Sequence, residues 1–269
     1  MIIIGEKING AIPSIKKAIE EKNEALIVKR AIAQANAGAD FIDCAPSTAT
    51  DIEYETMVWL IDLIQGATDV PLCIDSPNAQ LLARILNEGR VNKPGLVNSV
   101  NEEGTKCETI FPIIAGTPWE VIGLTCDQDG IPSDPVKKVE IAKRIIDKAV
   151  KYGVALNQLH IDPCVMALST TAGAMDDFIY CIEHIHALAP EVKVTGAISN
   201  ISFEMPARKY VNMNCMAYAL KAGLDSAIMD PTNEDMLGTI YACEALTMKD
   251  KSGRKYNRAY RKGLFGQKK

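Results

Sequence analysis

The chain has 269 residues, of which 48% are hydrophobic, and its formal net charge at pH 7 is −5, which suits one large globular domain. No apolar run approaches the roughly 20 residues that a helix needs to cross a bilayer. The N-terminal sequence MIIIGEKING also lacks the basic leader and cleavage site of a signal peptide, so we expect a cytoplasmic protein that binds no membrane.

Short β-rich runs alternate with longer amphipathic segments from one end of the chain to the other. Helices are predicted at 51–65, 78–89 and 135–153, the last with Pro135 in its first turn and Gly153 at its end. Strands are predicted at Ile2–Ile4, Phe41–Cys44, Leu72–Asp75, Leu96–Ser99, Val121–Thr125, Leu159–Asp162, Lys193–Ser199 and Ala227–Asp230.

This alternation predicts a parallel sheet covered by helices, which is an α/β fold. Eight such units in about 250 residues favour a closed (β/α)₈ barrel, the TIM barrel, over an open doubly wound sheet. The sequence contains no glycine-rich phosphate loop to support a nucleotide-binding alternative. Because no linker divides the chain, we predict one barrel domain over residues 1–248.

The remaining segment, 249–269, forms a basic C-terminal tail. It holds nine Lys/Arg and one acid, a net charge of +8, while the 20 basic and 33 acidic residues before it leave −13 for the barrel. A basic stretch with tyrosines could bind nucleic acid. We favour a terminal helix or tail that docks on the acidic body, and we expect no nucleic-acid partner.

Acids and amides follow the predicted strands. Because the active site of such a barrel lies at the C-terminal ends of its strands, these side chains should point into one mouth. Caps of turns and helix starts explain one or two of them, but they explain Asp75 and Asp162 poorly because each ends a buried strand. The set comprises Glu6, Asp43, Asp75, Asn98, Asp162, Asn200 and Asp230.

A ring of acids and amides with almost no cations is a poor site for phosphate. It suits a neutral heterocycle that is rich in hydrogen-bond donors, such as the 2-amino-4-oxo-pyrimidine edge of a pterin or a guanine. Flat rings of this kind fit a barrel mouth lined by a few fixed polar groups. The eight cysteines form no C-x-x-C pair and the three histidines are scattered, so no metal site is expected.

The motifs IIGEKING, FID, LCIDS, VNSVN, IGLT…GIP, HIDP and SNISFEMPAR occur in the order and at about the spacing of the pterin-binding methyltransferases. The chain most resembles the methyltetrahydrofolate:corrinoid-protein methyltransferases, over all but its basic tail. This resemblance implies a homodimeric enzyme that moves the N5 methyl group of methyltetrahydrofolate to Co(I) of a corrinoid, reversibly. The sequence has no D-x-H-x-x-G motif, so a separate corrinoid protein must carry that cofactor.

The resemblance also implies roles for individual residues. Asp75, Asn98 and Asp162 match residues that hold the pterin by hydrogen bonds. Asn200 matches the catalytic residue whose side chain approaches N5, and Arg208 matches a substrate-binding arginine just beyond it. The expelled N5 must gain a proton or a strong hydrogen bond, which the Asn200 amide could support electrostatically.

Several further residues are candidates or departures from the family pattern. Glu6, Asp43 and Asp230 are possible site residues because they also end strands. Phe203, a fourth possible site residue, stands where some relatives have glutamine, and Ala45 stands where the family often has asparagine. His160 precedes Asp162 by two residues and should face the barrel interior, where a packed core histidine is favoured over a proton relay.

Two other functions compete with methyl transfer. Dihydropteroate synthase is also a pterin-binding barrel, but it must bind pyrophosphate, and the predicted seventh and eighth strands end without a lysine in GAISN and IMDPTNED. A non-catalytic pterin-binding barrel is the other alternative, because fold does not fix function. The departures at Ala45 and Phe203 are the hints in its favour.

Overall fold

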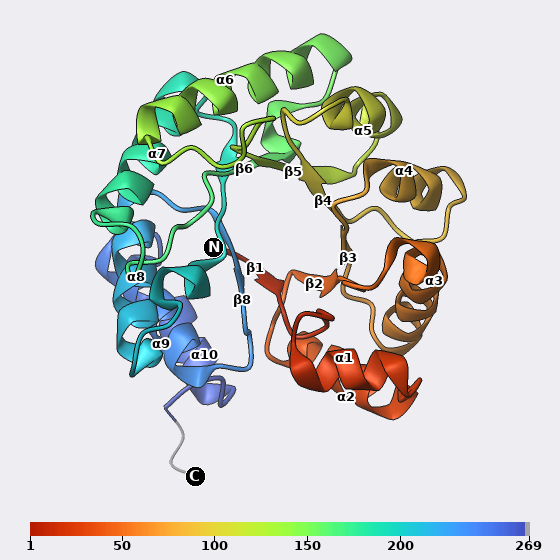
Figure 1. Cartoon of the computed structure of the whole chain (residues 1–269). Helices are drawn as coiled ribbons and strands as arrows, with labels where there is room; N and C mark the ends of the chain where they lie inside the picture. Colours follow the sequence, from red (N-terminus) through yellow and green to blue (C-terminus); the bar gives the residue numbers. More distant parts are fainter. Residues whose placement is uncertain (267–269) are drawn as a thin grey trace.

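In the computed structural model, which describes residues 1–266, eight parallel strands curl into a barrel surrounded by helices (Figure 1). Each strand from β1 to β6 pairs with the next in sequence, and β1 also pairs with β8. The predicted single-domain (β/α)₈ barrel is therefore confirmed. The strands are β1 Ile2–Gly5, β2 Phe41–Cys44, β3 Leu72–Asp75, β4 Leu96–Val100, β5 Glu120–Leu124, β6 Leu159–Asp162, β7 Lys193–Val194 and β8 Ser226–Met229.

The seventh strand is much shorter than predicted. The chain leaves the sheet after Val194 and forms a 3₁₀ turn, η2, at Ile198–Ser202, where the sequence predicted strand up to Ser199. Gly196 explains the break, because a Cβ there would lie 2.9 Å from Cζ of Phe178 and because glycine weakens a strand. An isolated parallel bridge between Ala197 and Ile228 closes the barrel at this seam instead of a β7–β8 ladder.

The helices cover the outside of the barrel, and α3, α4 and α6 lie within two residues of the predicted ranges. Helix α6 begins as the sequence indicates, since Asp134 Oδ1 accepts a hydrogen bond from Val136 N at 2.9 Å, and it ends at Gly153 with φ +79°. The helices are α1 Pro13–Glu20, α2 Glu24–Asn36, α3 Thr50–Ala67, α4 Ala79–Asn87, α5 Lys106–Ile114, α6 Pro135–Tyr152, α7 Ala174–Leu188, α8 Arg208–Ala222, α9 Glu234–Leu246 and α10 Arg254–Arg261, with 3₁₀ turns η1 Leu156–Gln158 and η3 Lys251–Gly253.

Alternate residues of the strands fill two separate hydrophobic cores. One set packs inside the barrel as an apolar layer of Ile4, Phe41, Cys73, Leu96 and Ile122. On β2, β3 and β4 the next residue, which is Ile42, Ile74 or Val97, belongs to the larger core between the sheet and the helices. This two-residue period fixes which polar residues further along each strand face the barrel interior.

A buried polar network occupies the opposite, N-terminal end of the barrel. His160 Nε2 lies 2.6 Å from Glu120 Oε2, and His160 Nδ1 lies 2.8 Å from Ser226 Oγ. Lys193 forms an ion pair with the same Glu120 carboxylate. Burial lowers the pKa of His160, which favours its neutral form. The contacts place His160 in a structural network at the start of strands β5, β7 and β8.

The basic C-terminal segment, described as far as Gly266, packs against α9 (Figure 1). Phe265 is 6% exposed and its ring centroid lies 5.0 Å from that of Tyr256 and 5.7 Å from that of Tyr241. Lys255 Nζ lies 3.5 Å from Glu244 Oε2. Docking of this segment therefore combines aromatic packing with a charge contact. The last residues of the predicted tail, 267–269, lie outside the described part of the chain. None of the helices within residues 1–266 has both the length and the apolarity needed to cross a membrane.

The Phe265 contacts predict that the C-terminal segment contributes to stability. Phe265→Ala removes a buried aromatic ring and should lower the free energy of unfolding by about 3 kcal/mol, as measured by urea denaturation. Leu246→Ala is the control, because Leu246 is 83% exposed and should change stability little. Equal stability of the Phe265 variant and the parent would show that the segment is not part of the folded unit.

Candidate active site

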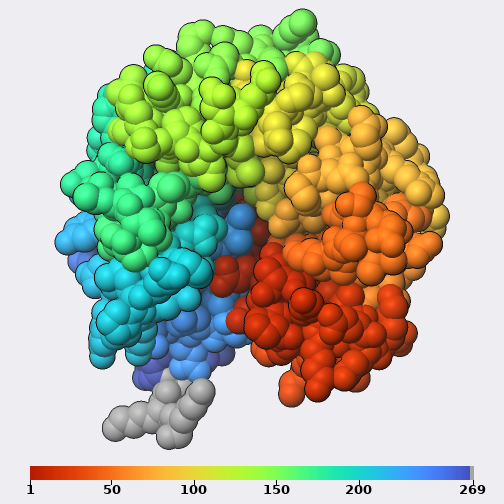
Figure 2. All heavy atoms as spheres, viewed as in Figure 1, coloured from red at the N-terminus to blue at the C-terminus, as the bar shows by residue number. Residues whose placement is uncertain are grey.

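The candidate acids and amides gather at one end of the barrel because of the strand period. Each lies two residues beyond an inward-facing residue of its strand, so it continues the same inward face at the C-terminal end. These positions are Glu6, Asp43, Asp75, Asn98, Asp162 and Asp230. The molecule is hollowed at its centre when viewed along the barrel, between its red N-terminal and its green-to-blue C-terminal segments (Figure 2).

Strands β3 and β4 bring two of the candidate residues together at this mouth. Asp75 and Asn98 are direct neighbours in the parallel pairing, and Ser76 N donates a 2.9 Å hydrogen bond to Asn98 O just beyond them. Asn98 is buried and Asp75 is partly buried. A carboxylate and an amide thus stand side by side, which matches the donor-rich edge of a pterin ring.

Asp43 lies beside this pair on β2. Its side chain is buried, and Asn9 Nδ2 lies 3.4 Å from Asp43 Oδ2. Oδ1 of Asp43 is also buried and has no hydrogen-bond partner among the described residues. Such an oxygen is costly unless it is protonated or finds a donor, so Asp43 can serve a ligand or share a proton with a neighbour.

Burial dominates the electrostatics of these acids. It raises the pKa of Asp75 to about 7, with the charge of Glu53 adding to the effect. Burial and then the nearby Asp75 raise the pKa of Asp43 well above its usual value. The pKa of Glu6 is also raised, mainly by burial, against the opposing effect of Lys7. The acids of β1, β2 and β3 therefore cannot all be ionised at neutral pH at low cost.

Asp162 lies across the barrel from this group, at the end of β6. Its Oδ1 accepts a 2.7 Å hydrogen bond from Cys164 N, which fixes the carboxylate against the following loop. The buried Lys138 reaches the same loop and donates to Cys164 O at 2.9 Å. Burial raises the pKa of Asp162 to about 6, although the Cys164 hydrogen bond and Lys138 oppose the shift. The second carboxylate oxygen accepts no hydrogen bond from the described residues.

The structure places Asn200 in the turn η2, where its side chain is exposed, although the sequence predicted it at the end of a strand. Arg208 supports this turn, because its Nε donates to Ser202 Oγ at 2.9 Å and its Nη2 donates to Ser199 O at 2.7 Å. Phe203 follows the turn and is 56% exposed. Because η2 follows the C-terminal end of β7, Asn200 lies at the same end of the barrel as the other candidates, and the Arg208 guanidinium holds the turn that carries it.

Asp230 caps a turn, which is one of the two roles that the sequence allowed for an acid at the end of a strand. Its Oδ1 accepts hydrogen bonds from Thr232 N at 2.9 Å and from Thr232 Oγ1 at 2.6 Å. Its Oδ2 lies 3.2 Å from Lys7 Nζ, in an ion pair at the mouth. Asp230 is thus engaged by the protein itself, in contrast to Asp43.

Ala45, which stands where the family often has asparagine, is buried and its backbone pairs with Asn9.

Sequence reasoning missed three polar residues at this end of the barrel. Lys7 and Asn9 lie in the loop after β1 and reach Asp230 and Asp43 through tertiary contacts, which no local pattern reveals. Glu53 is buried on α3, where it accepts a 2.6 Å hydrogen bond from Ser76 Oγ. A signal for Glu53 exists, because an acid stands on the helix face that otherwise buries Met57 and Leu60.

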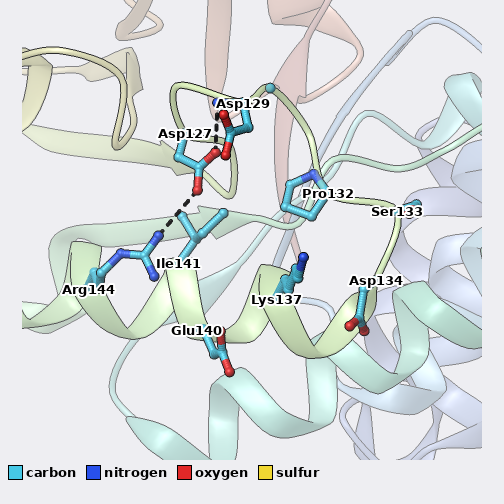
Figure 3. A pocket seen from close by; sticks show the side chains of 10 residues that line it. Asp127, Asp129, Pro132, Ser133, Asp134, Lys137, Glu140, Ile141 and Arg144 are labelled. Atoms are coloured by element: carbon cyan, nitrogen blue, oxygen red, sulfur yellow. Dashed lines mark hydrogen bonds and ion pairs between the residues drawn. The ribbon is translucent and has the colours of Figure 1, made fainter.

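A separate surface pocket of about 380 Å³ lies between the loop after β5 and the start of α6 (Figure 3). Arg144 Nη2 lies 3.4 Å from Asp127 Oδ2 across it, and Lys137 points toward the loop while Glu140 points away. None of the candidate site residues lines this pocket. Within residues 1–266 no group of three His, Cys, Asp or Glu side chains could hold a metal ion.

The chain belongs to the family of pterin binding enzymes, because residues 8–230 match the model of that family. It is 49% identical over 268 residues to the methylcorrinoid:tetrahydrofolate methyltransferase of Eubacterium limosum, covering 99% of this chain and 98% of that protein. It is also 29% identical over 244 residues to the methionine synthase of Mycobacterium tuberculosis (strain ATCC 25618 / H37Rv), of which it covers 20%.

Solved structures of dihydropteroate synthases share the fold. The enzyme from Clostridium difficile, solved in the presence of pteroic acid, has a TM-score of 0.67 and 18% identity, covering 91% of this chain and 96% of that one. The enzyme from Yersinia pestis with a pterine-sulfa conjugate has a TM-score of 0.66 and 15% identity, covering 93% and 94%. At these identities the likeness establishes the barrel and its connectivity, not the reaction.

The raised pKa of Asp162 predicts a gain in stability when its charge is removed. A folded-state pKa of about 6, above the unfolded value of 3.8, means that the folded protein binds the proton more tightly, so stability is lost as pH rises through this range. Asp162→Asn keeps an acceptor for Cys164 N and should raise the free energy of unfolding at pH 8 by about 3 kcal/mol.

Measurements of Asp162→Asn at low pH serve as the control. The stability difference between Asp162→Asn and the parent should shrink as pH falls from 6 toward 4, because the parent carboxyl becomes protonated. Urea denaturation at several pH values measures this difference. A difference that is constant over the whole range would show that Asp162 is not a buried ionised group.

Proposed function

We propose that this protein transfers a methyl group between N5 of tetrahydrofolate and the cobalt of a corrinoid held by a separate protein. One observation supports the proposal most: Asp75 pairs with Asn98 at the barrel mouth, with Asp162 on the opposite side. That arrangement occurs in a chain 49% identical, over nearly its whole length, to a methylcorrinoid:tetrahydrofolate methyltransferase.

In this proposal the acids and Asn98 bind the pterin ring. Asp75 and Asp162 accept hydrogen bonds from ring N–H groups, and Asn98 adds a neutral contact that can donate or accept. The apolar layer under the mouth, with Ile4, Phe41 and Cys73, excludes water from below the ring. Hydrogen bonds to a partly desolvated carboxylate are stronger than the same bonds in water, so a few groups suffice for binding.

The reaction exchanges one bond for another at the methyl carbon. In the direction that the relative's name gives, the N5 lone pair forms a bond to the methyl carbon, the cobalt–carbon bond breaks with its electron pair left on cobalt as Co(I), and N5 loses its proton. In the opposite direction methyltetrahydrofolate gives its methyl group to Co(I), and N5 takes up a proton. Both directions use the same groups of this chain.

Asn200 serves N5 in this proposal. The structure gives its amide no hydrogen bond within the described residues, and the turn that carries it is fixed from the far side by Arg208. An amide can donate to a lone pair or accept from an N–H, so it can follow N5 through either protonation state. Such a preorganised contact stabilises the transition state more than the bound substrate.

The cytoplasmic location and the homodimer implied by the family resemblance belong to the same proposal. The corrinoid protein must reach the mouth from outside, since its cobalt has to approach N5 to within bonding distance. Sedimentation of the purified protein tests the dimer, and co-sedimentation with a corrinoid protein tests the partner.

Dihydropteroate synthesis is the weaker alternative. That reaction releases pyrophosphate, which needs free cations near the mouth. Lys7 is held by Asp230 and the Arg208 guanidinium is bonded to the η2 turn, while several acids surround the mouth. A non-catalytic pterin-binding barrel would bind methyltetrahydrofolate but would show no single-turnover methyl transfer to a corrinoid protein.

Loss of a pterin-binding acid should weaken the binding of methyltetrahydrofolate. Asp75→Ala removes an acceptor and leaves a ring N–H unpaired in a confined site, at a cost of about 1–3 kcal/mol. The dissociation constant, measured by calorimetry at pH 8, should rise about tenfold or more. Glu183→Ala on the outer helix α7 is the control and should bind like the parent; a folded Asp75 variant with parental affinity would exclude Asp75 from the site.

Substitution of Asn200 should affect the rate more than the affinity. Asn200→Ala should slow single-turnover methyl transfer by about 10²–10³ at saturating pterin, with a smaller loss of affinity. Asn200→Asp should also be slow, because an ionised carboxylate cannot donate a hydrogen bond. If both variants transfer the methyl group at the parental rate, Asn200 has no catalytic role.

A further inference from the structure

A second carboxylate lies directly behind the candidate pterin acid Asp75. Glu53 belongs to the first turn of α3, yet it is 5% exposed. Its Oε1 accepts a 2.6 Å hydrogen bond from Oγ of Ser76, which is itself 1% exposed and follows Asp75 in the chain. A buried carboxylate is costly, and here its partner is a neutral hydroxyl rather than a cation. Such an arrangement calls for a functional explanation.

Through Ser76, Glu53 reaches the backbone that carries the pterin acids. Ser76 N donates to Asn98 O at 2.9 Å, and Ser76 Oγ accepts from Asn78 N at 3.0 Å. Ser76 therefore connects the end of β3 to β4 through its backbone N–H, and to the N-terminus of α4 and one acid on α3 through its hydroxyl. The carboxylate of Glu53 fixes the orientation of that hydroxyl.

The groups that face Asp75 are acidic or neutral. Helix α3 contributes Glu53, and β2 contributes Asp43, with Glu6 of β1 beyond it. Strand β4 contributes the neutral Asn98. The remaining titratable neighbours are the thiols Cys44 and Cys73, whose pKa values are raised well above normal by burial, so they stay neutral. None of these groups offsets the charge of Glu53.

We propose that Glu53 is a positioning residue of the pterin site that acts through Ser76 and Asp75: it fixes the end of β3, and its charge makes pterin binding release a proton. The inference rests on the proposed function and deepens it. In this proposal Glu53 touches no substrate, since it is 5% exposed and belongs to a helix outside the barrel.

The proton balance follows from the chemistry of the pterin edge. The N–H donors of the ring need an ionised carboxylate as acceptor, whereas a protonated Asp75 offers a competing donor. With a pKa of about 7, Asp75 is half protonated near neutral pH in the free protein. Binding therefore converts protonated Asp75 and free pterin into the ionised Asp75–pterin complex and one proton in solution.

The release of a proton on binding determines how the affinity for the pterin changes with pH. Below a pH of about 7 the free protein holds the Asp75 proton, so affinity for the pterin falls roughly tenfold for each further pH unit. Removal of the Glu53 charge stabilises ionised Asp75 and lowers its pKa. The fall in affinity should then begin at a lower pH.

Calorimetric titration of the full-length protein with methyltetrahydrofolate, between pH 5.5 and 8.5, tests the proposal. Parallel titrations in two buffers with different ionisation enthalpies count the protons released on binding. The parent should release a fraction of a proton at pH 7 and none at pH 8.5. Glu53→Gln, which keeps an oxygen acceptor for Ser76, should shift the midpoint of the affinity profile down by about one pH unit and release fewer protons at pH 7.

Two further variants control for structural effects. Glu55→Gln removes an exposed acid from the same helix and should keep the parental midpoint. Glu53→Asp keeps the charge but moves it, so its midpoint should lie between those of the parent and Glu53→Gln. This variant carries the test if Glu53→Gln does not fold. Thermal unfolding of each variant checks the fold.

The outcomes separate this inference from the proposed function. If the parent binds methyltetrahydrofolate with a pH-dependent affinity and the Glu53 variants keep the same midpoint and proton count, Glu53 is only a structural residue and the inference is wrong. A folded parent that fails to bind at any pH contradicts the proposed function instead. A general loss of affinity with an unchanged midpoint also overturns the electrostatic role of Glu53.

Discussion

The site depends on the placement of several ionisable carboxylates at the end of an apolar barrel. The layer of Ile4, Phe41, Cys73, Leu96 and Ile122 lies directly beneath them and keeps water from that side. A carboxylate in such surroundings is neutral or pays for its charge with hydrogen bonds. The surrounding structure supplies few cations, so the mouth is held ready for a ligand that brings N–H donors.

The fold alone does not identify the chemistry of this site. Dihydropteroate synthases share the barrel at 13–20% identity, so connectivity alone does not decide the chemistry. The side chains at the strand ends decide it. Here the cations at the mouth, Lys7 and Arg208, are committed to Asp230 and to the η2 turn. Carboxylate and amide oxygens remain to meet a substrate.

Much of the fold could be predicted because it follows from local periodicity. Strand and helix patterns located the eight strands, and the two-residue period assigned Asp75, Asn98 and Asp162 to the inward face. The seventh strand was predicted too long because the constraint at Gly196 comes from Phe178, which belongs to another element. Closure of the barrel through a single bridge is likewise a property of the assembled sheet.

The sequence predicted those residues of the candidate site that lie at the ends of strands. Asn9 and Lys7 reach the mouth from a loop, and Glu53 reaches it from a helix through a serine, so their roles depend on tertiary contacts. Asp230 shows the converse, since a strand-end acid is engaged by Thr232 and Lys7. The position of a residue along a strand thus predicts whether its side chain points into the barrel. Whether that side chain is available to bind a ligand depends on neighbouring residues, and the sequence does not show where these lie.

The seam between β7 and β8 has a mechanical consequence. Elsewhere around the barrel, neighbouring strands share at least two paired positions, but at the seam Ala197 and Ile228 make an isolated bridge, and η2 begins at the next residue. Local opening free energy depends on the number of backbone hydrogen bonds and buried contacts that must break. Two backbone hydrogen bonds also cross the seam, from Asp225 N to Val194 O at 3.0 Å and from Ile228 N to Gly196 O at 3.1 Å. With one paired position, the seam needs fewer backbone contacts to break for local opening than the β1–β8 ladder, which pairs four positions from Ile2–Ser226 to Gly5–Met229.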